Sequence, residues 1–197
     1  MHSAGCGCKE EHELATTSVC LRSQIDLQGV RVFNSDTLPT SGSLLFKPYS
    51  SRLSEGTLRS DPASDNELLF TVPFLNPSEI AHLLVVNESE GVLNVKLFVN
   101  RPDFDFSDVE AVKPTQELSI PPDFHGSLLH KLSLGKFKDV SDLALYFSGP
   151  NGVQLRYIGL RGKSRPRQAN VVDTSYELVP SASFQESLME LKNLKYV

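Results

Sequence analysis

The chain has no tryptophan, only three cysteines and two methionines, and no long hydrophobic run. Cys6, Cys8 and Cys20 all lie near the N-terminus, which is a poor disulfide framework and favours a reducing compartment, the cytoplasm or nucleus. Because no window holds about 18 apolar residues, we expect no membrane helix. Charged residues from Lys9 to Glu13 argue against a signal peptide. The net charge of -5 argues against non-specific nucleic-acid binding.

Catalytic patterns are also missing, including the P-loop and the nucleophile elbow. His82 lies within an apolar run and is expected to be satisfied in the core or on a sheet face. His125 and His130 are five residues apart, so an extended chain would direct them to opposite faces. We therefore predict a protein that is not an enzyme and uses no cofactor.

Soft metal ligands gather at the N-terminus: His2, Cys6, Cys8 and His12. Such thiolates and imidazoles suit zinc or copper(I), but their spacing is not that of a zinc finger. The preferred interpretation is a tail without metal, although binding stays open. Asp103, Asp105 and Asp108 lack the glycine and terminal glutamate of an EF-hand loop. We expect a loop there whose aromatic side chains enter the core, and we predict no metal site.

Short apolar runs with period-two alternation follow the N-terminal segment. Leu143, Leu145 and Phe147 alternate with Ala144 and Tyr146, which predicts a strand with one face in the core. Further strands are expected at 25–27, 30–32, 68–74, 79–87, 93–99, 118–120, 128–134, 153–160 and 176–179. A bulge at Gly29 and a turn at Asn76-Pro77 are also expected. The pattern predicts an all-β fold, an antiparallel β-sandwich, with a jelly-roll arrangement favoured.

Three segments are expected along the chain: a flexible tail at 1–21, the sandwich at 22–180, and a C-terminal amphipathic helix or tail at 181–197. Ser183 and Glu186 form a capping-box pattern at the start of the last segment. Its apolar residues recur at helical spacing: Phe184, Leu188, Leu191 and Leu194. This helix either docks on its own sandwich or binds a partner groove, and both interpretations stay open.

A basic stripe follows the strand expected at 153–160, with Arg161, Lys163, Arg165 and Arg167 at every second position. An extended chain would present all four on one side. The stripe either protects an edge strand against aggregation or binds an acidic protein surface or phosphates.

Three ordered segments resemble the PITH domain, the proteasome-interacting domain found also in certain thioredoxin-like proteins: Phe46-Lys47-Pro48-Tyr49, the run from Glu67 to Phe74, and Tyr157-Ile158-Gly159-Leu160-Arg161-Gly162. The resemblance implies a jelly-roll sandwich of galactose-binding-like type and docking on the 26S proteasome regulatory particle. The chain is similar to stand-alone PITH proteins without a thioredoxin domain, so redox activity is not expected.

Candidate partner-binding residues are Lys47, Tyr49, Arg161, Lys163 and Arg165. We expect a monomer that binds neither nucleic acid nor membrane. The alternative is a module that binds a carbohydrate or another small molecule, suggested by fold analogy. The missing tryptophan counts against a sugar site, because sugars usually stack on exposed aromatic rings.

Overall fold

The computed structural model describes residues 18–37, 39–62 and 65–164. Its strands are β1 (Val19–Cys20), β2 (Arg31–Phe33), β3 (Leu58–Arg59), β4 (Glu67–Asn87), β5 (Leu93–Val99), β6 (Gln116–Ile120), β7 (Leu129–Lys131), β8 (Val140–Ser148) and β9 (Gln154–Ser164). Its helices are the 3₁₀ turns η1 (Leu21–Gln24), η2 (Pro39–Leu45) and η3 (Tyr49–Ser51) and the α-helix α2 (Phe106–Ala111). Within this part of the chain, no helix is long and apolar enough to cross a membrane.

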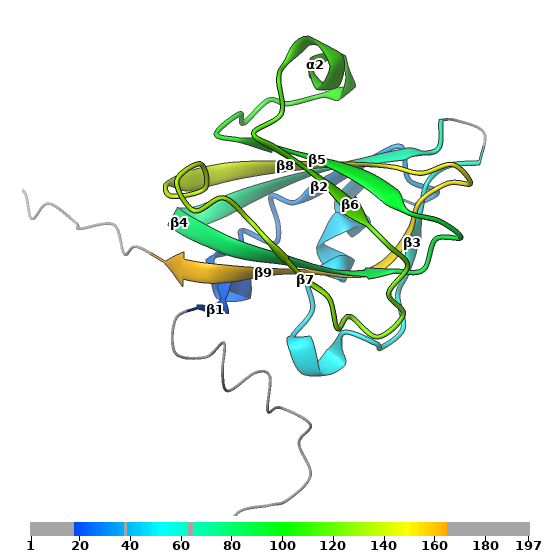
Figure 1. The fold of residues 1–197 in the computed structure, drawn as a ribbon, viewed down its shortest axis with the longest axis horizontal. Coiled ribbons are helices and arrows are strands. Elements are labelled where there is room, and N and C mark those ends of the chain that lie inside the picture. The colour runs from blue at the N-terminus through cyan, green and yellow to red at the C-terminus, as the bar shows by residue number, and fades with distance from the viewer. Residues whose placement is uncertain (1–17, 38, 63–64, 165–197) are drawn as a thin grey trace, which may run out of the picture. The chain divides into compact units, whose positions relative to one another are not determined.

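The long strand β4 belongs to both sides of a curled antiparallel sheet (Figure 1). Its first half pairs with β2 and β8, and its second half, from Ser78, pairs with β7 and β9, while Ser78 itself also pairs with Val140 of β8. β5 and β6 continue beyond β8, while β1 and β3 pair with β9. We call β2, the first half of β4, β8, β5 and β6 the β8 side. The second half of β4 with β7, β9, β1 and β3 is the β9 side.

The main core lies between the two sides and follows the period-two alternation of the strands. On β8, Leu143, Leu145 and Phe147 enter this core. Phe147 meets Phe70 of β4 edge to face, with ring centroids 5.8 Å apart. Removing these apolar side chains from water is the main driving force for the fold.

Each side also carries a smaller cluster on its outer face. On the β8 side, the segment containing α2 covers Leu69, Phe98 and Tyr146 with Phe104 and Val109. On the β9 side, Tyr49 at the start of η3 packs against a cluster of Leu84, Val86 and Tyr157. Figure 1 shows α2 above β8 and β5. These two short helices therefore shape the two outer faces.

The prediction of an all-β antiparallel fold is confirmed, with four local corrections. The expected strand at 25–27 is not formed: Ile25 makes an isolated bridge with Phe74, and a turn follows. Asn76-Pro77 does not form a turn, because β4 runs through it. Gly29 is not a bulge; it lies in a turn in which its N–H donates to the carbonyl of Asp26. The segment at 103–108 is not only a loop: Asp105 caps α2 and forms a capping box with Asp108. Phe104 does enter a core, as expected.

Several predictions lie outside the described residues: most of the tail at 1–21 with its cysteine and histidine ligands, Arg165 and Arg167, the strand at 176–179 and the helix at 181–197.

Candidate functional site

Strand register on the β9 side aligns basic side chains from three strands. Lys131 of β7 is opposite His82 of β4, and His82 is opposite Arg161 of β9. Arg161 is in turn opposite Cys20 of β1. Opposite residues in an antiparallel ladder share a face, so the four form one row across the sheet. Lys163, two positions beyond Arg161 on the same face, is exposed. We call Lys131, His82, Arg161 and Lys163 the basic face.

The basic face is an outer face of the sandwich. Leu160, next to Arg161, belongs to the main core, whereas Tyr157 belongs to the outer cluster of the β9 side. Because alternate residues of a strand share a face, Arg161 lies on the side of Tyr157. Arg161, Tyr157 and Tyr49 also line one small cavity of about 30 Å³. The structure therefore brings together two of the predicted partner-binding residues, Tyr49 and Arg161.

Two glycines, Gly159 and Gly162, lie on either side of Arg161 in the sequence, at positions where other atoms approach the β9 backbone closely. A Cβ atom at position 162 would overlap the backbone oxygen of Glu79, where the pairing of β4 with β9 shifts register between Ile80 and His82. A Cβ atom at position 159 would lie 2.6 Å from the hydroxyl oxygen of Tyr157. These positions need glycine because backbone and a tyrosine side chain approach them closely.

His82 is half-buried between two cations. Burial lowers the pKa of its imidazole, and Arg161 and Lys131 lower this pKa further. Its Nδ1 and the Nε of Arg161 are both buried without a hydrogen-bond partner among the described residues. The prediction of a sheet-face position is confirmed, but Nδ1 is not satisfied. At neutral pH the imidazole is mostly neutral, so Arg161 and Lys131 carry the charge of this row.

Lys47 and Tyr49 have roles within the chain itself. The ammonium of Lys47 donates to the carbonyls of Ser54, Glu55 and Gly56 at 3.0, 2.7 and 3.1 Å. Tyr49 is half-buried, and the guanidinium of Arg52 lies 4.1 Å from its ring centroid. Their predicted contacts with a partner stay predictions. The geometry favours Arg161 and Lys163 over Lys47, because the ammonium of Lys47 is already surrounded by carbonyl oxygens.

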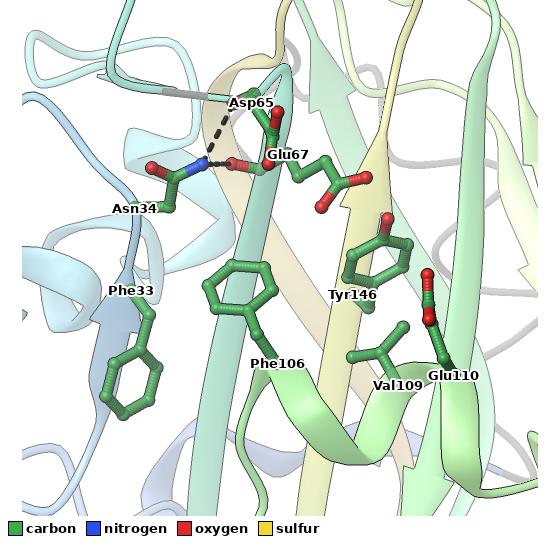
Figure 2. Close-up of a pocket in the computed structure, with 8 residues that line it drawn as sticks. All are labelled: Phe33, Asn34, Asp65, Glu67, Phe106, Val109, Glu110 and Tyr146. Carbon is green, nitrogen blue, oxygen red and sulfur yellow. Dashed lines mark hydrogen bonds between the residues drawn. The ribbon is translucent and has the colours of Figure 1, made fainter. Parts of the chain in front are cut away.

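A second feature is a groove of about 530 Å³ on the outer face of the β8 side. It combines aromatic rings with carboxylates and is lined by Phe33, Asn34, Asp65, Glu67, Phe106, Val109, Glu110 and Tyr146 (Figure 2). We call it the aromatic–acidic groove. Phe33 and Tyr146 are both opposite Leu69 of β4, which places their strands on either side of its base. Phe106, Val109 and Glu110 come from α2.

Asn34 fixes the rim of this groove. Its φ of 63° is left-handed, a conformation that asparagine tolerates better than most residues. Its Nδ2 donates to the carbonyls of Asp65 and Glu67, both at 2.9 Å. The segment after β2 is thereby tied to the start of β4.

Sequence reasoning missed most residues of the groove. Only the alternation in β8 pointed to Tyr146 as an outward side chain, while Asn34, Asp65 and Glu110 gave no periodic signal. Asp123 was also missed: its carboxylate accepts from the backbone N–H groups of His125, Gly126, Ser127 and Leu128. A single carboxylate that organises a turn in this way has no sequence pattern beyond the turn residues around it.

A model of the PITH domain matches residues 11–180. The chain belongs to the PITH domain family. A PITH domain-containing protein of Schizosaccharomyces pombe is 30% identical over 191 residues, 92% of this chain and 91% of the relative. PITH domain-containing protein 1 of Xenopus laevis is 27% identical over 170 residues, 82% of this chain and 80% of the relative. The predicted family is confirmed. Membership suggests a non-catalytic interaction module, and no catalytic family is indicated.

Among solved structures, the chain resembles the CBM32-1 and CBM32-2 domains of Clostridium perfringens ZmpB, determined in complex with GalNAc. The TM-score is 0.50 at 11% identity, over 79% of this chain and 38% of the other. Such a likeness shows the fold alone. The predicted β-sandwich fold of jelly-roll type is thus confirmed.

Proposed function

We propose that this PITH domain is a non-catalytic docking module that binds an acidic surface of the 26S proteasome regulatory particle, in the cytoplasm and nucleus. The observation that carries the proposal is the register that aligns Lys131, His82 and Arg161, with Lys163 beyond them. In a chain of net charge -5, Lys131, Arg161 and Lys163 gather on this face beside the carboxylate of Glu79, which lies opposite Lys163. Aligned cations on a rigid sheet suit steering toward an acidic partner.

The experiment is capture of regulatory particles from cell lysate by the tagged protein at low and high salt. Arg161→Glu with Lys163→Glu places like charges opposite the acidic partner, and we expect about a tenfold loss of affinity or more. The matched control reverses two exposed cations that flank α2, Arg101→Glu with Lys113→Glu, and should capture normally. Equal capture by both double variants at low salt would remove the basic face from the interface.

Melting temperature separates folding from binding. Arg161 is half-buried, so its replacement carries some risk to the fold. Lys163 is exposed and lies opposite Glu79, so Lys163→Gln alone, which puts no like charge against that carboxylate, should keep the wild-type melting temperature while weakening capture. Normal capture by this single variant, together with unfolding of the double variant, would mean that Arg161 is structural and would contradict the proposal. The sugar of the solved neighbour lends no support to a carbohydrate function here, because that likeness shows only the fold.

A further inference from the structure

We infer that the aromatic–acidic groove binds an organic cation, an alkylammonium or guanidinium group attached to an apolar chain. The groove shares no residue with the basic face, so this inference is independent of the proposed docking function. Its volume of about 530 Å³ falls within the range of roughly 300–1,000 Å³ that small-ligand sites occupy.

The polar groups that face this groove are almost all acceptors. Asp65, Glu67 and Glu110 contribute carboxylates, and the described residues that line the groove include no lysine or arginine. The two amide hydrogens of Asn34 are occupied by backbone carbonyls. Figure 2 shows the hydroxyl of Tyr146 directed toward the carboxylate of Glu67. Burial, then this hydrogen bond, raises the pKa of Tyr146, so the hydroxyl keeps its proton and donates it internally.

A lining in which free acceptors predominate selects among ligand classes. Ammonium and guanidinium groups have donors and no acceptors, so every polar atom of such a ligand finds a partner here. An anion would meet three carboxylates and be repelled. A neutral sugar also carries acceptor oxygens, and these would lose their bonds to water without gaining side-chain donors.

The aromatic rings add a second, independent preference for a cation. Phe33 is 37% exposed at one wall, and Phe106 stands near the middle of the groove (Figure 2). Phe106 meets Tyr146 edge to face, with ring centroids 6.3 Å apart. Cations are attracted to the faces of such rings, and the apolar stem of the ligand would cover Phe33. The ring of Tyr146 already has one cation near it: the ammonium of Lys96 lies 5.6 Å from its centroid.

The test is a titration of the isotope-labelled protein, followed by backbone amide NMR shifts. N-acetyl-arginine methylamide is the probe, N-acetyl-citrulline methylamide is its neutral isostere, and spermidine and galactose are separate arms. We expect saturable shifts at Phe33, Asn34, Glu67 and Glu110 with the arginine derivative. The citrulline derivative should bind about fivefold more weakly or worse, because it lacks the charge. If the arginine derivative binds more tightly than spermidine, the cation that the groove binds is a protein side chain. If spermidine binds more tightly, the cation is a polyamine.

Two double variants locate the site. Glu67→Gln with Glu110→Gln should weaken the arginine derivative about fivefold or more, whereas Glu90→Gln with Glu117→Gln, exposed carboxylates outside the groove, should not. Should the first pair unfold, Glu110→Gln alone tests the same point on an exposed residue. The inference is overturned if no shifts appear throughout the millimolar range, if galactose or the citrulline derivative binds as well as the cation, or if both double variants weaken binding equally.

Discussion

On the β8 side, α2 covers an outer cluster around Tyr146, and on the β9 side η3 contributes Tyr49 to one around Tyr157. The two faces thus share a construction, in which a short helix packs on the outside of a sheet. They differ in charge and in where that charge comes from. The basic face takes its cations from strands in register, whereas the aromatic–acidic groove takes its carboxylates from a helix, a connection and the start of a strand.

This difference teaches which part of the fold each face depends on. Arg161 and Lys131 are aligned only if β9 and β7 keep their register against β4. Asp65 and Glu67 instead face the groove because Asn34 ties their backbone to the end of β2. A change that weakens strand pairing should therefore disrupt the basic face before the groove. Loss of the side-chain amide of Asn34 should disrupt the groove before the basic face.

The largest effect is expected from Gly162→Ala, which tests the strand register under the basic face. A methyl group there would overlap the backbone oxygen of Glu79, so β9 must move away from β4. We expect the free energy of unfolding to fall by about 3 kcal/mol or more. Chemical denaturation measures it, and Gly135→Ala, whose Cβ would have no atom within 4 Å, is the matched control. Equal stability of the two variants would show that the register tolerates a side chain at 162.

The basic face was only partly predictable from the sequence. Period two predicted that Arg161 and Lys163 share a side, but their alignment with His82 and Lys131 depends on strand order, which no local pattern carries. Strand β4 was divided in two because Asn76-Pro77 is typical of a turn. Pro77 is tolerated because it lies outside both ladders: β4 pairs with β8 up to Pro73 and again at Ser78, and its pairing with β9 begins at Ser78. The groove was not predictable, since Asn34 and Asp65 meet only through the fold.

An intermediate effect is expected at Asn34, which tests the groove's dependence on one amide. Asn34→Ala loses two hydrogen bonds and places alanine at a φ of 63°, so we expect a loss of about 2 kcal/mol. Asn34→Gly keeps the backbone conformation and should lose only about 1 kcal/mol. Denaturation gives both values, and amide shifts at Glu67 should change in both variants. Unchanged shifts at Glu67 would contradict the role of Asn34 as the tie of the rim.

The smallest effect concerns the protonation of His82, which reports the positive field of the basic face directly. Burial, then Arg161 of β9 and Lys131 of β7, lowers its pKa below the ordinary 6.5, and an NMR titration of its ring protons should show this. Because the folded pKa is lowered, the unfolded chain binds the proton more readily. The contribution of His82 to the free energy of unfolding is therefore fully present above its pKa in the unfolded chain. It is lost as the pH falls through its pKa in the folded protein. His130, whose pKa burial also lowers, contributes with the same sign, so His82→Gln should remove only part of this pH dependence.

Arg161→Gln and Lys131→Gln should each raise the pKa of His82, whereas Lys113→Gln, outside the basic face, should leave it unchanged. A pKa of His82 at or above 6.5 in the wild-type protein would mean that the aligned cations do not act on it, and that the contrast in charge between the two faces is weaker than their residues suggest.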